Sequence, residues 1–337
     1  MTDLISTEDG LIDQMTTPSE AVIEAVAKLD GPVLILGVGG KMGPTLAQLF
    51  VRAGCNKVTG VSRFNDSDLR ERLEKTGVST IQADLLDDEA LDRLPDVPNI
   101  LFLAGFKFGA TGNESMTWAM NSWLPGRVLQ RFSHSRIVYV SSGNVYAYTT
   151  SETKGAKESD QLGPIGEYAQ SRLGGERIAA YFSQKQGTPL TLVRLFYATE
   201  LRYGILHDIA WKIVQNEPID LSMGYVNQIW QGDANAYLAR LFPTCESPAT
   251  VVNVTGQQVL SIRDVSSKLA DRLGKFPIFT GKEQDNALLG DAQDLFDQSG
   301  YPSISTDQMI EWVAHWVSIE GKSLGKPTKY DSRTGSF

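Results

Sequence analysis

The sequence predicts an α/β protein in which helices cover both faces of a parallel sheet, a doubly wound arrangement. Apolar runs at 32–36, 99–105 and 135–140 lack regular alternation with polar residues, which is typical of strands buried on both faces. The first run breaks into a glycine-rich turn, and apolar residues then recur at helical spacing between 44 and 50. A strand, a glycine turn and a helix in this order predict the βα unit that begins such folds.

The glycine-rich turn has the spacing G-x-x-G-x-x-G, on Gly37, Gly40 and Gly43. A G-x-G-x-x-G reading fails, because position 42 is Met42. The backbone N–H groups of such a turn can reach a pyrophosphate, and the following helix N-terminus favours its negative charge. The alternative is a tight turn without a ligand. The turn residues expected to bind a dinucleotide are Gly37, Gly39, Gly40, Lys41, Met42 and Gly43.

Length and composition limit the class of protein. The chain has 337 residues, enough for one large domain or two closely packed ones. Its net charge of −9 disfavours nucleic acid as a partner, since that would need a basic surface. Cys55 and Cys245 form no C-x-x-C pair, which fits a reducing cytoplasm. The three histidines are scattered, which argues against a histidine-based metal site.

The sequence also predicts that the protein neither spans a membrane nor is exported. No apolar run is long enough to cross a bilayer. The first residues, Met1–Ile5, lack the basic start of a signal peptide. We therefore expect a cytoplasmic protein with a small-molecule partner.

The end of the second predicted strand, 57–61, bears on the choice of cofactor. A carboxylate there would bind the ribose 2′-hydroxyl of NAD and repel the 2′-phosphate of NADP. This chain has Ser62 and then Arg63, and arginine pairs well with phosphate. The sequence therefore favours NADP over NAD. In the alternative, Arg63 is a solvated surface charge or stacks on adenine with NAD bound.

Several motifs in a fixed order resemble the extended short-chain dehydrogenase/reductase family, the NAD-dependent epimerase/dehydratase group. Besides the turn, they include Ser141-Ser142 after the strand at 135–140, followed by Val145-Tyr146, and Tyr168 with Arg172 four residues later. The resemblance covers roughly residues 31–320. It implies a Rossmann-like sheet and a smaller α/β part that closes over the substrate crevice.

The resemblance implies a catalytic role for three residues. Ser142 would hydrogen-bond the reacting oxygen, and Tyr168 would be the general acid/base. Arg172 stands where the family has lysine, whose charge favours the ionised tyrosine and whose donors bind the nicotinamide ribose. Arginine keeps the charge and donors but is bulkier. This departure leaves an alternative: an NAD(P)-binding sensor or scaffold with little or no turnover.

Further cofactor contacts follow from the resemblance. The strand ending at Ala104 and Gly105 has small residues that let backbone approach a ligand. A predicted helix at 114–132 carries Asn121, which could instead be a satisfied core amide. Asp84 could instead cap the helix at 88–91. The expected cofactor-binding residues beyond the turn are Ser62, Arg63, Asp84, Leu85, Ala104, Gly105, Asn121, Ser141, Tyr168, Arg172 and Phe196.

The predicted substrate is a sugar or sugar acid. Lys107 follows the apolar run at 99–105 and is a candidate for holding an anionic or polar substrate, and Asn144 and Tyr197 are further expected substrate contacts. Segment 224–233 lacks the arginine with which many nucleotide-sugar enzymes bind a diphosphate, which weakens a nucleotide-sugar assignment. In the same segment, Asn227, Gln228 and Trp230 would suit a sugar ring or interior packing equally.

These expectations define a domain plan and a function. The plan has a helical extension at 1–30, an NAD(P)-binding domain at 31–200, a partly interleaved substrate-binding part at 201–320, and a C-terminal arm at 321–337. The extension contains a capped amphipathic helix near 18–26. The function is an NAD(P)-dependent oxidoreductase or epimerase acting on a hydroxyl or keto group of a sugar-derived molecule. The family resemblance further implies a homodimer.

Overall fold

A seven-stranded parallel sheet forms the centre of the molecule in the computed structural model, which describes residues 4–335. Residues 1–3 and 336–337, the outer ends of the predicted extension and arm, lie outside this range. The sheet order is β12-β7-β5-β4-β1-β2-β3. Its strands are β1 (Val33–Leu36), β2 (Val58–Ser62), β3 (Ser79–Gln82), β4 (Asn99–Phe102), β5 (Arg136–Val140), β7 (Leu190–Leu195) and β12 (Thr250–Val254).

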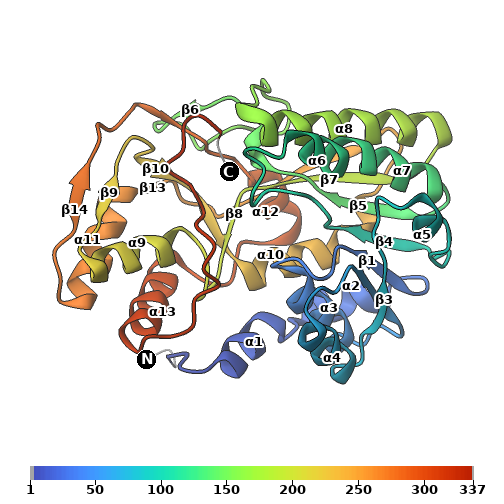
Figure 1. Cartoon of the computed structure of the whole chain (residues 1–337), viewed down its shortest axis with the longest axis horizontal. Helices are drawn as coiled ribbons and strands as arrows, with labels where there is room; N and C mark the ends of the chain where they lie inside the picture. Colours follow the sequence, from blue (N-terminus) through green and yellow to red (C-terminus); the bar gives the residue numbers. More distant parts are fainter. Residues whose placement is uncertain (1–3, 336–337) are drawn as a thin grey trace.

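Helices cover both faces of this sheet, so the predicted doubly wound α/β fold is confirmed (Figure 1). Side chains of β1 alternate between two cores: Val33 and Ile35 pack on one face, and Leu34 and Leu36 on the other. The helices of the first face are α2 (Glu20–Ala27), α3 (Gly43–Arg52), α4 (Ser67–Lys75) and α10 (Gln231–Arg240). Those of the second face are α5 (Asp88–Asp92), α6 (Glu114–Trp118), α7 (Leu124–Arg131) and α8 (Gly166–Gln186).

The strand order reverses at β1, which lies between β2 and β4. Leu36 pairs with Phe102 at the carboxyl ends of β1 and β4. The two segments that follow these strands, beginning at Gly37 and Leu103, therefore leave the sheet next to each other. In parallel sheets, ligands bind in the crevice outside such a switch point.

The predicted helix at 114–132 is interrupted. It consists of α6, a π-helical turn at Ala119–Trp123, and α7. Pro125 has no N–H to donate to the carbonyl oxygen of Asn121, four residues earlier. That oxygen instead accepts from the Tyr139 hydroxyl of β5 at 3.4 Å. The bulge thereby joins Asn121 to the sheet.

The N-terminal extension has two helices where the sequence predicts one. Ser19 caps α2, accepting from Val22 N at 3.4 Å, as expected of the capped helix near 18–26. The additional helix, α1 (Glu8–Thr16), is anchored to α3 by Arg52, whose Nη1 lies 2.8 Å from Asp13 Oδ1.

The smaller part packs three helices, α9 (Ile205–Gln215), α11 (Ile262–Leu273) and α13 (Thr306–Ser318), around a second core. Strand β12 returns from this part to the edge of the large sheet, beside β7. Two-stranded pairs complete it: β8 (Tyr197–Thr199) with β11 (Gln228–Trp230), β9 (Pro218–Asp220) with β14 (Ile278–Thr280), β10 (Tyr225–Val226) with β13 (Leu260–Ser261), and β6 (Thr149–Thr150) with β15 (Asn286–Ala287). The remaining helices are α12 (Gln293–Ser299) and short turns at Gly143–Val145 and Phe242–Thr244.

From residue 321 to 335 the C-terminal arm forms neither helix nor strand and crosses the smaller part (Figure 1). Leu324 N donates to Arg202 O at 3.0 Å, and Tyr330 is only 2% exposed. The arm therefore docks on the core of its own chain.

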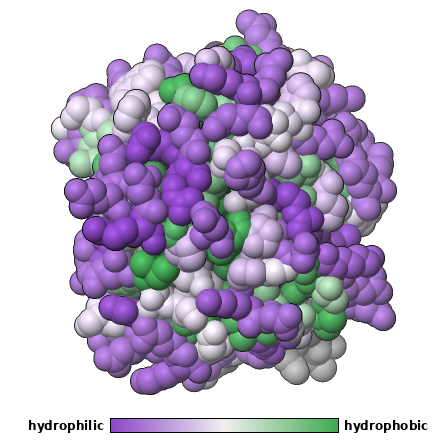
Figure 2. Space-filling view, turned by 90° about the vertical axis from the view of Figure 1, so that its right-hand side faces the viewer, coloured by the Kyte–Doolittle hydropathy of each residue, from purple (hydrophilic) through white to green (hydrophobic). Residues whose placement is uncertain are grey.

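The surface at the right-hand end of Figure 1, beside α5 and β3, is mainly hydrophilic, and its hydrophobic residues form small separate patches (Figure 2). None of the described helices is both long and apolar enough to cross a membrane.

Candidate active site

Two adjoining cavities lie at the carboxyl ends of β1 and β4, and both reach Gly37, Gly40 and Gly105. We call the first the central cavity; it extends past the ends of β5 and β7 to the smaller part. The second, the outer cavity, extends toward the ends of β2 and β3. Together they follow the crevice expected at the switch point.

The glycine turn lets the backbone after β1 lie close to the end of β4. Gly37 has φ +89°, and a Cβ added there would lie 2.6 Å from Ala104 N, so any other residue would clash with the end of β4. Helix α3 begins at Gly43, and Met42 at its N-cap makes no side-chain capping hydrogen bond. The N-terminus of α3 therefore lies at the central cavity, which Met42 and Gly43 line, without a side-chain cap, an arrangement that suits a phosphate.

The outer cavity brings together the residues expected at the adenosine end. Its lining includes the predicted contacts Gly39, Ser62, Arg63, Asp84, Leu85 and Ala104. Asp84 Oδ1 accepts from Leu86 N at 3.0 Å, while Asp87 caps α5. The alternative role of Asp84 as the helix cap is therefore wrong. Arg63 is exposed, and no ion pair within residues 4–335 holds its guanidinium.

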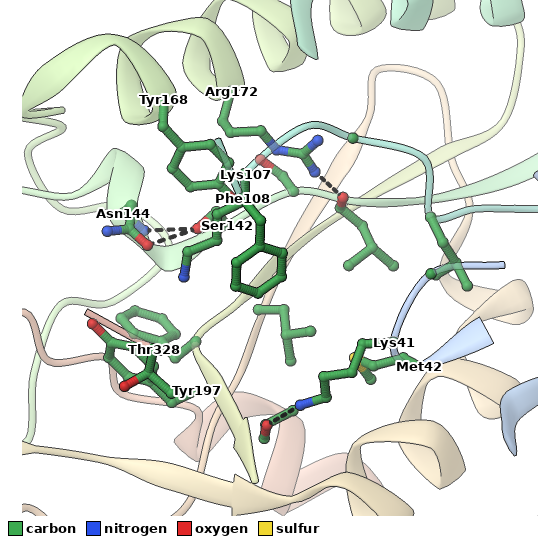
Figure 3. Close-up of a pocket in the computed structure, with 18 of the residues that line it drawn as sticks. Lys41, Met42, Lys107, Phe108, Ser142, Asn144, Tyr168, Arg172, Tyr197 and Thr328 are labelled. Carbon is green, nitrogen blue, oxygen red and sulfur yellow. Dashed lines mark hydrogen bonds between the residues drawn. The ribbon is translucent and has the colours of Figure 1, made fainter. Parts of the chain in front are cut away.

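The three residues with an expected catalytic role all line the central cavity. Ser142 follows β5, and its Oγ bonds to Asn144 Oδ1 at 3.0 Å and accepts from Asn144 N at 3.2 Å. Tyr168 lies in the first turn of α8, with its ring on the same side of the cavity as Ser142 (Figure 3). A substrate oxygen held between these two hydroxyl-bearing side chains would meet both a hydrogen-bond donor and a proton acceptor.

Arg172 does not extend into open space as a surface arginine would. Its Nη2 donates to Val140 O, at the end of β5, and its Nη1 lies 3.5 Å from Asn121 Oδ1 (Figure 3). A Cβ at Gly105 would lie 2.5 Å from Nη1, so glycine there makes room for the guanidinium. Burial opposes the charge, but coulombic interactions, chiefly with Tyr139, outweigh it and raise the pKa of Arg172. The site therefore keeps a fixed positive charge.

Asn121 does not line either cavity. Its amide accepts from Phe106 N at 2.8 Å, donates to Phe106 O at 2.9 Å and donates to Ser171 Oγ at 3.1 Å. It is a satisfied core amide that joins the loop after β4 to α8, and so acts through Phe106 and Ser171 rather than at the cavity wall.

Two lysines enter the central cavity. Lys41 Nζ donates to Ala198 O at 2.5 Å and lies 4.0 Å from the Tyr203 ring centre (Figure 3). Burial lowers its pKa to about 7. Lys107 Nζ lies 5.7 Å from the ring centres of both Tyr168 and Tyr197, and burial lowers its pKa to about 8. An anion in this cavity would stabilise both ammonium groups.

Some of the other predicted contact residues line the central cavity, and others do not. Met42, Ser141, Asn144, Phe196 and Tyr197 line the central cavity. By contrast, Asn227, Gln228 and Trp230 line neither cavity and are at most 3% exposed, so interior packing is their role rather than contact with a sugar ring.

Sequence reasoning missed part of the cavity wall. Tyr203 and Gly204 come from the loop after β8, Leu288 from the segment after β15, and Thr328 from the C-terminal arm. Thr328 Oγ1 and N both donate to Asp208 Oδ2, at 2.6 and 2.8 Å. The arm has no periodicity and no turn motif near Thr328, so no signal in the sequence marked it.

The hydrogen-bond donors that line the site, as well as the shape of the crevice, suit a nicotinamide dinucleotide. Within residues 4–335, Ser141 Oγ and Arg172 Nε are buried without a hydrogen-bond partner, and both residues line the central cavity. Buried donors of this kind need partners, and ribose hydroxyls would supply them.

Comparison with known proteins agrees with this geometry. The model of the NAD dependent epimerase/dehydratase family matches residues 33–199, about half of the chain, from β1 to β8. A 2-alkyl-3-oxoalkanoate reductase from Shewanella oneidensis is 24% identical over 174 residues, which cover 50% of this chain and 43% of the reductase. The match therefore spans less than half of that relative's length.

Solved structures share the fold. UDP-glucuronic acid 4-epimerase from Bacillus cereus, in complex with NAD, is 17% identical with a TM-score of 0.73, and the alignment covers 87% of this chain and 99% of the epimerase. dTDP-glucose 4,6-dehydratase from Bacillus anthracis, also with NAD, is 14% identical with a TM-score of 0.73, covering 86% and 96%. The prediction of a Rossmann-like fold is confirmed, and the chain belongs to the NAD-dependent epimerase/dehydratase family.

Proposed function

We propose that this protein is an NAD(P)-dependent oxidoreductase or epimerase that acts on a hydroxyl or keto group of a sugar or sugar-derived small molecule. One observation carries the proposal: Ser142, Tyr168 and Arg172 line one cavity that continues to the glycine turn. An acid/base group, an oxygen-binding hydroxyl and a cation are the parts that proton transfer at a carbinol oxygen requires.

In this proposal the chain's residues handle the proton and the cofactor supplies the hydride chemistry. Gly37, Gly40 and the start of α3 would hold the pyrophosphate, and Ser141 and Arg172 the ribose on the nicotinamide side. A bound nicotinamide accepts or donates hydride. Ser142, whose hydroxyl donates to Asn144 Oδ1 in the structure, would turn this hydrogen toward the substrate oxygen. Tyr168 takes the hydroxyl proton during oxidation and returns it during reduction, and the Arg172 charge stabilises the ionised phenol.

We further propose that the cofactor is NADP rather than NAD. Arg63 follows β2 at the outer cavity, and Asp84 is the one acidic residue among the described residues that line it. An exposed guanidinium suits a 2′-phosphate, since it can donate two parallel hydrogen bonds.

A second candidate is a sensor or scaffold that binds NAD(P) with little turnover. The observation that favours it is the engagement of Arg172 with Val140 O and Asn121, which takes up donors that a lysine in the family would offer to the ribose. In that case cofactor binding would persist without proton exchange at Tyr168.

The discriminating experiment compares Tyr168→Phe with Tyr301→Phe, at an exposed tyrosine outside the site and outside α8. Both variants should bind the cofactor as the wild type does. Turnover with sugar acids or polyols should fall roughly 10²–10⁴-fold in Tyr168→Phe only, since a positioned proton acceptor contributes that much. Cofactor binding with no turnover in any of the three proteins would favour the sensor.

We also propose a homodimer formed through α8 and the interrupted helix beside it. Trp118, Trp123 and Tyr181 on these elements are 40%, 58% and 57% exposed, which leaves aromatic surface available for a second copy. Light scattering should give twice the chain mass for the wild type and a monomer for Trp123→Glu. A monomeric wild type at micromolar concentration would refute the dimer.

A further inference from the structure

A further cavity adjoins the central cavity beside the C-terminal arm. Lys107 and Phe108, in the loop after β4, line both cavities. We call the further cavity the arm groove, and the rest of its lining is Gly109, Gly325, Lys326, Pro327 and Lys329. The Phe108 ring forms the shared wall, because its centre lies 6.0 Å from that of the Tyr203 ring in the central cavity and 5.4 Å from Lys326 Nζ in the groove. The groove therefore extends the substrate side of the site along the arm.

The arm is held in place where the two cavities meet. Thr328 lines the central cavity and is 1% exposed, and its Oγ1 and N both donate to Asp208 Oδ2 (Figure 3). Its neighbours Pro327 and Lys329 line the arm groove instead. Lys329 has φ +51°, a left-handed conformation that lysine seldom adopts. The arm thus contributes one residue to the central cavity and lysines to the groove.

The charged side chains that line the arm groove are all positive. They belong to Lys107, Lys326 and Lys329, and none of the described residues in the lining is acidic. Lys326 and Lys329 are exposed, and within residues 4–335 neither of their ammonium groups is in an ion pair. The one carboxylate of the described part of the arm, on Asp331, lies 3.4 Å from Lys212 Nζ. The groove therefore carries positive charge that no carboxylate in its lining offsets.

Two lysines on one wall suit a phosphate group better than a single carboxylate. A phosphate monoester carries close to two negative charges at neutral pH, so each ammonium group attracts it about twice as strongly as a carboxylate at the same distance. Lysine binds phosphate as a point charge and does not need the forked geometry that arginine supplies. The lining of the groove thus favours a phosphate group as its ligand.

We propose that the arm groove binds a phosphate group of the substrate, held by Lys326 and Lys329, while the reacting hydroxyl or keto group faces Tyr168. This inference rests on the proposed function and names its substrate class, a phosphorylated sugar-derived molecule. The phosphate belongs either to a sugar phosphate or to a sugar joined to a nucleoside diphosphate. Because the chain has a net charge of −9, a positive groove also directs such an anion to this part of an otherwise acidic surface.

The test is calorimetric titration of the full chain, saturated with its oxidised cofactor so that the glycine turn is occupied. The ligands are D-glucose, D-mannose, the 1- and 6-phosphates of both sugars, and UDP-glucose. At least one phosphorylated ligand should bind at least about tenfold more tightly than its parent sugar, a difference of about 1.4 kcal/mol. This preference should shrink at least about threefold between roughly 0.05 and 0.5 M KCl, because the groove lysines are exposed to solvent. Comparison of the monophosphates with UDP-glucose distinguishes the two sources of the phosphate.

Variants of the arm assign the preference to the groove. The double variant Lys326→Met/Lys329→Met should abolish the preference for phosphate, while the Kd of the parent sugar and of the cofactor should each stay within about twofold. Lys322→Met is the matched control, because it removes an arm lysine that does not line the groove and whose Nζ lies 3.1 Å from Glu8 Oε1. This control should keep the preference.

Three results would overturn the inference. They are equal binding of every phosphorylated ligand and its parent sugar, no binding of any phosphorylated ligand at about 10 mM, and a preference for phosphate that survives in the double variant. In each case, cofactor binding together with a Tyr168-dependent turnover would leave the proposed function standing. A chain that binds no cofactor would refute both.

Discussion

The guanidinium of Arg172 donates a hydrogen bond to the main-chain oxygen of Val140, the last residue of β5. This bond joins the helix that carries Tyr168 to the strand end that carries Ser141 and Ser142. Where the family has a lysine, Arg172 therefore serves here both as a cation and as a hydrogen-bonded link between α8 and β5. That double use explains why a longer, forked side chain is accommodated at this position.

Replacing Arg172 should damage catalysis and stability together. Arg172→Met leaves Val140 O unpartnered in the interior, and we expect unfolding free energy to fall by about 1–3 kcal/mol. The loss of the cation should lower kcat by roughly 10²–10³-fold. The matched control is Arg177→Met on the exposed face of α8. Equal effects of the two substitutions in urea unfolding and steady-state kinetics would contradict this account.

Lys41 should make stability depend on pH. Its pKa is lowered to about 7 in the folded protein by burial, so between about pH 7 and 10.5 the unfolded chain binds more protons. The contribution of Lys41 to unfolding free energy therefore rises with pH across that window, by at most about 1.4 kcal/mol per pH unit. The difference between wild type and Lys41→Met, measured by urea unfolding at pH 7, 8 and 9, should increase with pH. A constant difference would show that Lys41 is charged throughout.

Arg63 should decide between the two cofactors. Arg63→Ala removes the group that we propose for the 2′-phosphate, and the Kd of NADPH should rise about 10- to 100-fold, as expected for a lost charge-assisted bond. The Kd of NADH should change little. Arg72→Ala, which replaces an exposed arginine on the following helix α4, serves as the control. Equal affinity for NADPH in the wild type and Arg63→Ala would refute the assignment.

Asn121 should matter for stability through the loop after β4. In Asn121→Ala the N–H and C=O of Phe106 lose their partners, and we expect unfolding free energy to fall by about 1–3 kcal/mol. The exposed Asn113, whose side chain donates to Gly109 O, provides a control whose alanine variant should stay within about 0.5 kcal/mol. A small effect at Asn121 would mean that the loop holds its position by packing alone.

The parts of this site that could be predicted from the sequence are those that depend on short local patterns of residues. The turn from Gly37 to Gly43 follows from an apolar strand and glycine spacing, and Tyr168 with Arg172 from one helical turn. The break at Asn121 also had a local signal, because Pro125 forbids the hydrogen bond that a continuous helix would need.

The parts that could not be predicted depend on long-range packing. Thr328 reaches Asp208 across 120 residues of sequence, and no property of an aperiodic arm marks one of its residues for the cavity. Likewise Asn227 and Trp230 have side chains that suit a sugar as well as an interior. Only the return of β11 beside β8 decides in favour of the interior.

The most direct test of the account is a titration of the wild-type protein with NAD⁺, NADP⁺, NADH and NADPH, followed by calorimetry and by fluorescence of the reduced forms. The account predicts saturable binding of at least one form at one site per chain, with NADP(H) bound more tightly than NAD(H). Preference for NAD(H) would contradict the role given to Arg63 alone. Binding of none of the four would contradict the central claim, that the crevice from Gly37 to Tyr168 is a nicotinamide site.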